Sequence, residues 1–260
     1  MITLGLVYAC ATVPVTNRKQ LALISNDEII SLSAQNYRQV LTESRLSDDA
    51  QQVALVKRVG QRIQHAVERY FKEQNNEAYL AGFDWEFNLI DNDTIVNAWC
   101  MPGGKVAFYT GIMPICLDEA GVAVVMGHEV AHAIANHGRE RMSQQMALYG
   151  ILSVGQAATG ASKNTLDDIL LQAVGAGSQL GMLKFSRDQE SEADRMGLIF
   201  MAMAGYDPAA APQFWQRMSA MTGSQQPPEF LSTHPSHERR IADLQKWQAE
   251  ARKYYRPAGN

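Results

Sequence analysis

The stretch that most constrains this chain is the apolar run G-V-A-V-V-M-G-H-E-V-A-H-A-I-A-N-H, residues 121–137. Its small and aliphatic residues predict a buried helix, and Asp118 just upstream is a suitable N-cap. Burying two imidazoles and a carboxylate there without partners would cost several kcal/mol. The chain must therefore fold so that His128, Glu129 and His132 find partners in its interior.

The spacing of the two histidines predicts a metal site. At about 100° per residue, His128 and His132 project within about 40° of each other, so both imidazoles can bind one ion. Glu129 lies in the same arc, where it can act as a general base on water without being a ligand. Zinc suits this site because catalytic zinc takes three nitrogen or oxygen ligands and leaves one position open. A structural helix with two unrelated histidines is the alternative.

A third ligand must come from elsewhere in the chain. Positions 135 and 138 are alanine and glycine, which excludes the H-E-x-x-H-x-x-G-x-x-H pattern. On a continuous helix His137 lies about 180° from His128, which favours a polar or capping role near the helix end. The ligand is therefore expected among the downstream carboxylates.

A helix predicted over residues 186–204 supplies these carboxylates in R-D-Q-E-S-E-A-D-R. Glu190 and Asp194 share one face by their i, i+4 spacing, while Glu192 points away. Glu190 is the expected third ligand. Asp194, one turn along, is placed to accept the free N–H of a ligand histidine, and a solvated surface charge is the alternative. Arg187 is as readily an exposed arginine and is left outside the catalytic set.

The remaining pattern predicts an α+β fold that is mostly helical. Helical periodicity covers residues 26–44, 48–73, 207–221 and 236–251, with two moderately apolar, Gly-rich helices within 146–181 that would be able to cover the cleft. Strands are expected at 83–90, 95–100 and 105–110. We expect a small antiparallel sheet on the active-site helix, with 95–100 between the other two strands.

Composition limits the partners and the number of domains. With 260 residues, 46% hydrophobic and 19% charged, the chain is expected to form one domain over residues 26–260. The net charge of −4 provides no global basic field, so nucleic acid is not an expected partner. Cys100 and Cys116 are expected to be buried thiols, with a disulfide between them as the alternative.

The first 25 residues are predicted to be a signal-like, anchor-like or extended segment. An apolar run, residues 2–9, leads into Cys10 and resembles the end of a bacterial lipoprotein signal, which would place a lipid on Cys10. A frayed terminus is the alternative, because the run is short and lacks a basic start. No run approaches the ~18 apolar residues of a spanning helix, so membrane association is expected only through such a lipid.

Four motifs occur in a fixed order: N-A-W-C-M-P-G-G, H-E-V-A-H followed by N-H, E-S-E-A-D-R-M-G and T-H-P-S-H-E-R-R-I. Over about residues 90–241 they resemble metallopeptidase family forty-eight, the gluzincins that include CAAX prenyl endopeptidases and bacterial heat-shock membrane peptidases. The chain looks most like the soluble, often lipid-anchored bacterial members. The resemblance implies a zincin fold with a small sheet and one zinc ion.

The resemblance also implies roles for individual residues. Glu190 would be the third zinc ligand and Asp194 the supporting acid, as the helical spacing predicts independently. His234 would stabilise the oxyanion formed on the scissile carbonyl. Residues Asn97, Ala98 and Trp99 match an edge strand that would bind an extended peptide by β-augmentation, although Trp99 packing into the core would explain the same pattern. His237 receives no role.

These patterns lead us to expect a zinc endopeptidase of broad specificity that acts on unfolded or extended proteins in the bacterial cell envelope, facing the periplasm. A noncatalytic zinc-containing chaperone or assembly factor is the main alternative, and the intact Glu129 argues against it because a structural site needs no base. A zinc hydrolase of small amides is a third class, which would require a closed pocket.

Overall fold

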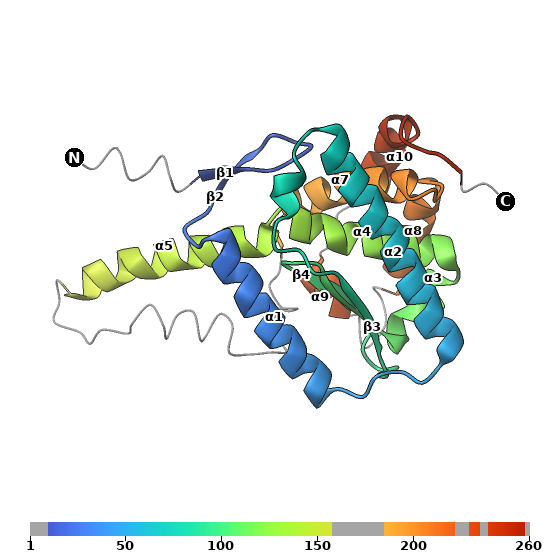
Figure 1. Ribbon diagram of the computed structural model, residues 1–260, viewed down its shortest axis with the longest axis horizontal. Helices are drawn as coiled ribbons and strands as arrows, with labels where there is room; N and C mark the ends of the chain where they lie inside the picture. Colours follow the sequence, from blue (N-terminus) through green and yellow to red (C-terminus); the bar gives the residue numbers. More distant parts are fainter. Residues whose placement is uncertain (1–9, 158–184, 222–228, 235–238, 258–260) are drawn as a thin grey trace.

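The architecture is a set of helices packed around one central helix and a small sheet (Figure 1). The computed structural model describes residues 10–157, 185–221, 229–234 and 239–257. Along the chain the elements are β1 (Cys10–Thr12), β2 (Lys19–Leu21), α1 (Asn26–Glu43), α2 (Ala50–Glu73), η2 (Glu77–Leu80), β3 (Glu86–Ile90), β4 (Ala98–Met101), β5 (Lys105–Tyr109), η3 (Thr110–Ile112), α3 (Met113–Cys116), α4 (Glu119–Ile134), α5 (His137–Ala157), α7 (Arg187–Met203), α8 (Ala210–Ala220), α9 (Glu229–Thr233) and α10 (Arg240–Ala251). The predicted α+β class, mostly helical, is confirmed.

The three-stranded sheet is mixed, in the order β3-β5-β4. β4 and β5 form an antiparallel hairpin around the turn Pro102-Gly103-Gly104, where both glycines have positive φ. β3 instead pairs with β5 in parallel, so the expectation of an antiparallel sheet with residues 95–100 in the middle is wrong. An alternating pattern of apolar and polar residues identifies β3 as a strand. It does not predict whether β3 pairs with β4 or with β5, or in which direction.

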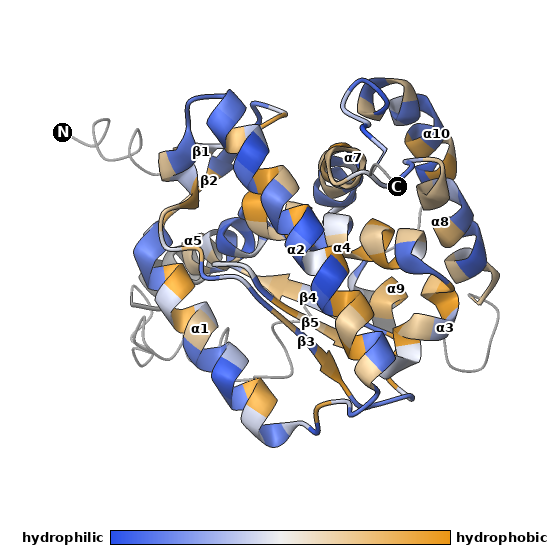
Figure 2. Cartoon of the chain, turned by 45° about the vertical axis from the view of Figure 1, so that its right-hand side comes forward, coloured by the Kyte–Doolittle hydropathy of each residue, from blue (hydrophilic) through white to orange (hydrophobic). Residues whose placement is uncertain are grey.

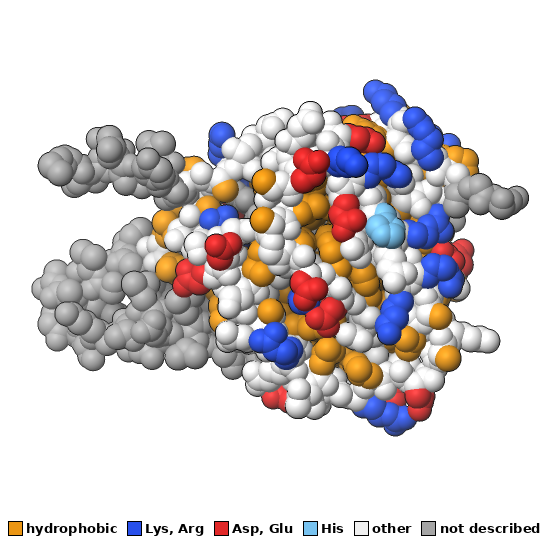
Figure 3. Space-filling view, in the orientation of Figure 1, with side chains coloured by type: hydrophobic (Ala, Val, Ile, Leu, Met, Phe, Trp, Pro, Cys, Tyr) orange, Lys and Arg blue, Asp and Glu red, His pale blue; other side chains and the backbone are white. Residues whose placement is uncertain are grey.

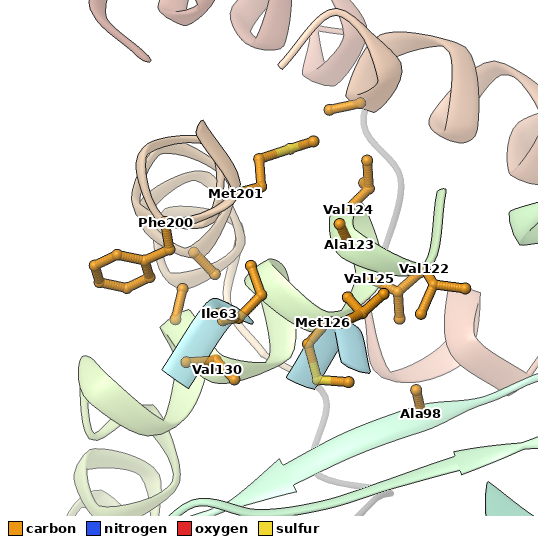
Figure 4. Close-up of a cluster of buried hydrophobic side chains, with 14 of the residues drawn as sticks. Ile63, Ala98, Val122, Ala123, Val124, Val125, Met126, Val130, Phe200 and Met201 are labelled. Atoms are coloured by element: carbon orange, nitrogen blue, oxygen red, sulfur yellow. The ribbon is translucent and has the colours of Figure 1, made fainter. Parts of the chain in front are cut away.

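Helix α4 forms the centre of the core (Figure 4). Asp118 is its N-cap, as predicted, and accepts a hydrogen bond from the Gly121 amide at 2.8 Å. The helix contacts α7, α2, α8 and β4, so its whole circumference is covered. Such all-round burial explains why its sequence is almost uniformly apolar instead of amphipathic. Figure 2 shows the hydrophobic strands beneath helices whose outer faces are hydrophilic.

α4 ends at Ile134, so the continuous helix expected through residue 137 is wrong. Asn136 takes a left-handed conformation with φ of 56°, which Asn tolerates better than most residues. Tyr79 secures the break: its hydroxyl donates to the Ile134 carbonyl at 2.7 Å and accepts from the Asn136 amide group at 2.9 Å. α5 then starts a new direction at His137, so the helical periodicity of α4 no longer decides where that side chain points.

The other predicted helices α1, α2, α7 and α8 occur within a few residues of their expected bounds. α7 opens with a capping box in which Ser186 and Gln189 exchange side-chain and backbone hydrogen bonds. Of the apolar region expected to form two helices over 146–181, the described part continues α5 to residue 157, and residues 158–184 lie outside the described residues. α10 is described from Arg240 onward.

The N-terminal segment forms a two-stranded antiparallel hairpin, β1 with β2, that packs on the body (Figure 1). Val13 in its turn is fully buried. Arg18 pairs with Glu140 of α5 at 2.7 Å and with Glu192 of α7 at 2.8 Å. The Leu23 amide donates to the Ser143 hydroxyl of α5 at 2.9 Å. Residues 10–24 are thus tied to two helices of the main body.

All three cysteines are free thiols, and Cys116 is buried as expected, whereas Cys100 is only partly buried. Cys10 is exposed at the start of β1, and its lipidation stays a prediction. Within the described ranges no single helix is long and apolar enough to cross a membrane, although the bent pair Thr110–Cys116 and Glu119–Ile134, at 119°, satisfies length and composition. Acidic and basic side chains are interspersed on the face seen in Figure 3.

Candidate metal centre

Two helices bring the predicted ligands together. α4 presents His128 and His132, whose Nε2 atoms are 3.1 Å apart. α7 presents Glu190 from its first turn, with Oε2 at 3.6 Å from Nε2 of His128 and Oε1 at 3.4 Å from Nε2 of His132. All three side chains are buried. The three residues expected to hold the metal therefore converge on one point.

The distances between the donor atoms fit a small cation such as zinc. Ligand bonds of about 2.0–2.1 Å in tetrahedral geometry place donor atoms roughly 3.3 Å apart. Burial lowers the pKa of both imidazoles well below their ordinary value, so they are neutral and free to ligate. Burial would raise the pKa of Glu190, but the charges of His234 and Arg240 outweigh it and hold that pKa well below its usual range. Two neutral imidazoles and one carboxylate make a donor set typical of zinc.

Glu129 stands beside this cluster without joining it. Its carboxylate is buried, and Oε1 accepts no hydrogen bond from any described residue. Burial raises the pKa of Glu129 to about 8, well above that of an ordinary glutamate. A buried carboxylate oxygen that accepts no hydrogen bond from the described part of the chain and lies beside these candidate ligands is well placed to receive a proton.

His234 enters the site directly after α9. Its ring stacks on Phe230 at 4.5 Å between centroids. Nδ1 lies 2.9 Å from Oε1 of Glu190 and 3.2 Å from Nε2 of His128, so His234 completes a cluster of four candidate donors within 4.8 Å of one another. Nε2 lies 3.5 Å from Oε1 of Glu129. Nδ1 of His234 therefore faces the candidate metal ligands, and Nε2 faces the carboxylate of Glu129.

Asp194 lies where the spacing on α7 predicts. Its Oδ1 is 3.0 Å from Nδ1 of His128, the nitrogen turned away from the other donors. Its second partner, Arg240, was not predicted from the sequence and donates to Asp194 at 2.7 Å and to Glu190 at 2.8 Å. The guanidinium of Arg240 lies 3.2 Å from the ring centre of Trp215. Two buried carboxylates one turn apart require a cation nearby. This requirement was the signal in the sequence for a basic partner such as Arg240.

A second missed feature lies behind His132. Nδ1 of His132 is 2.8 Å from Nδ1 of His137, and Nε2 of His137 is 2.9 Å from Oε2 of Glu192. His137 is not among the four donors, as expected, but it touches one of them instead of merely capping a helix. Burial opposes ionisation of Glu192, yet hydrogen bonds from His137, Thr16 and Arg18 lower its pKa to about 2.

The predicted substrate strand lies at the edge of the sheet. β4 has only β5 as a sheet neighbour among the described strands. Asn97 precedes β4 and is buried, and its side-chain oxygen accepts the Ala98 amide at 2.9 Å. Ala98 and Trp99 line a pocket together with Glu129, His132 and His234. The rest of this pocket is largely apolar and includes Ile29, Met101, Pro102, Ala133, Met142 and Phe185.

Comparisons with known proteins identify a family for this chain. Residues 59–248 match the family described as Peptidase family M48. The mitochondrial metalloendopeptidase OMA1 of Schizosaccharomyces pombe is 33% identical, over 92% of this chain and 66% of its own length. That of Saccharomyces cerevisiae is 31% identical, over 93% and 70%. The β-barrel assembly-enhancing protease of Escherichia coli is 33% identical, over 61% of this chain and 33% of its own length.

The family match spans both α4 and α7, the two helices that supply the three expected ligands. It confirms the resemblance that the four motifs indicated. The relatives are named metalloendopeptidases and a protease, so the expectation of a hydrolase is confirmed at the level of the family. This chain belongs to peptidase family M48.

Proposed function

We propose that this protein is a zinc-dependent endopeptidase that hydrolyses peptide bonds of unfolded or extended proteins. The observation that carries the proposal is the convergence of His128, His132 and Glu190 beside the buried carboxylate of Glu129, whose Oε1 accepts no hydrogen bond from the residues that the structure describes. A structural metal site has no use for such a base, so the geometry favours catalysis over a chaperone that keeps metal only for stability.

Each residue has a distinct task in this proposal. His128, His132 and Glu190 would hold one zinc ion, which supplies a Lewis acid for the scissile carbonyl and for the attacking water. Glu129 takes the proton from water and passes it to the departing amine. His234 would donate from Nε2 to the oxygen that becomes negative during attack. Asp194 holds the ring of His128 in place.

The position of β4 supports an extended substrate. An edge strand offers backbone groups that pair with a peptide of almost any sequence, while an adjoining pocket selects among side chains. The pocket beside Glu129 is mostly apolar, so we infer that an apolar substrate side chain enters it. Folded proteins seldom present such segments, and this would restrict cleavage to unfolded or extended chains.

We also propose that the protein works in a bacterial cell envelope, facing the periplasm, in protein quality control. The support is the exposed Cys10 at the end of a signal-like run, and the similarity to a bacterial relative that is named for enhancing β-barrel assembly. Attachment to the membrane would then occur through a lipid on Cys10. Mass spectrometry of Cys10 in cells that process lipoproteins tests this part, and an unmodified thiol there would refute it.

The decisive experiment measures cleavage of an unfolded protein such as casein by the zinc-loaded enzyme. A chelated sample and the Glu129→Gln variant are the controls, with zinc content measured in each. We expect cleavage only by the unaltered, zinc-loaded protein, with a loss of at least ~100-fold in Glu129→Gln. If the variant and the original protein bind zinc equally and neither cuts, while both prevent aggregation of casein, the chaperone alternative replaces the peptidase.

A further inference from the structure

The ligand His132 is held from behind by a row of side chains that ends in the N-terminal hairpin. We propose that Arg18 and Glu192 act through His137 as positioning residues for His132, so that residues 10–24 form a working part of the metal centre. This inference rests on the proposed metal-dependent function. It goes beyond that function because neither the reaction nor the predicted ligand set requires anything from the hairpin.

The hydrogen bonds along the row have one consistent direction. Nε2 of His132 faces His128 and Glu190, so the proton of a neutral imidazole resides on its Nδ1. That N–H can donate to Nδ1 of His137 at 2.8 Å. His137 then carries its own proton on Nε2 and donates it to Oε2 of Glu192 at 2.9 Å. Every donor meets an acceptor, which fixes both tautomers and both ring orientations.

The far end of the row is anchored by charge. Glu192 accepts a hydrogen bond from Nε of Arg18 at 2.8 Å and another from the hydroxyl of Thr16. The two terminal nitrogens of Arg18 bind both oxygens of Glu140 at 2.7 and 2.8 Å. Gln189 donates to Glu140 at 2.8 Å. One guanidinium thus joins α5 to α7 at the point where α7 delivers the third ligand.

The turn of the hairpin is shaped to deliver these groups. Val15 and Asn17 both have positive φ, of 68° and 59°, and such a conformation is unfavourable for a β-branched residue. The buried Val13 donates its amide to the Arg18 carbonyl at 2.8 Å, closing the turn. This turn brings the side chains of Thr16 and Arg18 to one carboxylate, that of Glu192. Strained backbone persists where the surrounding contacts enforce it, and it is often part of a functional site.

A purely structural role predicts something different. Ion pairs that only fasten the hairpin would change the stability of the metal-free protein and leave zinc affinity unaltered. Residues that orient a ligand through hydrogen bonds typically change metal affinity by roughly 10- to 100-fold when they are replaced. The dissociation constant for zinc therefore separates the two roles, independently of any peptidase assay.

The experiment measures zinc affinity of the full chain by competition with a chromophoric chelator. We expect His137→Phe to weaken binding by roughly 10- to 100-fold and Arg18→Met by about 10-fold. The matched control is Arg195→Met. Arg195 also lies on α7, and the change removes its partly exposed ion pair with Glu250 of α10. Its affinity should stay within about twofold of the original protein, because Arg195 does not touch the row.

Two further variants make the outcome decisive. Arg18→Lys keeps the charge and should restore part of the affinity, and the double variant Arg18→Met with His137→Phe should bind no more weakly than His137→Phe alone if both act through one row. Should Arg18→Met fail to fold, Thr16→Val removes one hydrogen bond to Glu192 and is measured instead. Unchanged affinity in the folded variants overturns this inference, whereas absent zinc binding by the unaltered protein overturns the proposed function.

Discussion

At the scale of single residues, the most consequential side chain outside the predicted set is Arg240. It is almost fully buried and lies between the carboxylates of Glu190 and Asp194, with Trp215 beneath its guanidinium. Charges buried in this way are tolerated because each is paired and hydrogen-bonded. Arg240 therefore determines whether the two carboxylates of α7 can stay in the interior at all.

Replacing Arg240 by Met should destabilise the metal-free protein by about 3–5 kcal/mol, because two buried carboxylates lose their cation. Urea unfolding of chelated samples measures this loss. The matched control is Arg252→Met at the end of the same helix, whose pair with Asp207 is long at 3.5 Å and about half exposed. That change should cost no more than ~1 kcal/mol. Equal losses in the two variants would contradict the assignment.

At the scale of elements, α4 and α7 approach each other through a pair of glycines. A Cβ on Gly127 would stand 2.9 Å from the carbonyl oxygen of Gly197, and a Cβ on Gly197 would stand 2.9 Å from the amide nitrogen of His128. Any side chain here would press on the backbone that carries a ligand. The small residues thus set the separation between α4, which carries two of the proposed ligands, and α7, which carries the third.

Gly197→Ala should lower the free energy of unfolding by about 1–3 kcal/mol, since the added methyl overpacks a contact between backbones. It should also weaken zinc binding, because α7 must move away from His128. Gly138→Ala is the control, as a Cβ there meets no heavy atom within 4 Å. Gly197 and Gly138 both lie in helices, where alanine is intrinsically favoured over glycine. Gly138→Ala should therefore leave the free energy of unfolding unchanged or raise it by up to ~1 kcal/mol. Thermal unfolding checks both, and an unharmed Gly197→Ala would refute the close-approach argument.

At the scale of the whole molecule, the site joins segments far apart in the chain: α4, the start of α7 and the residue after α9. An ion bound there cross-links these segments and stabilises only the folded state. The candidate donors already lie within 4.8 Å of one another, so binding requires no large rearrangement of the core. Zinc should therefore act on global unfolding and not only on local order near the ligands.

Zinc at about 100 times its dissociation constant should stabilise the protein by ~2.7 kcal/mol. For a chain of this size, that corresponds to a rise in melting temperature of about 5–10 °C, and a chelator should reverse it. His132→Ala should abolish the rise, whereas Glu129→Gln should keep it, because Glu129 is not among the proposed ligands. A melting temperature indifferent to zinc in the unaltered protein would exclude the metal site.

The sequence by itself determined what one helix can present. Spacing along α4 and α7 placed His128, His132 and Glu190 on facing sides and predicted the position of Asp194. A capping residue, Asp118, located the start of α4. These inferences succeed because helical geometry is periodic and depends only on neighbours in the chain.

Only the tertiary structure decided the rest. The left-handed Asn136 redirected His137 toward His132, and pairing between distant segments set the parallel partner of β5. Arg18 and Arg240 reach the site from opposite ends of the chain, and neither carries a local signal of doing so. The physical reason is that burial of charge is settled by contacts between segments, and local periodicity says which face is apolar without saying what will cover it.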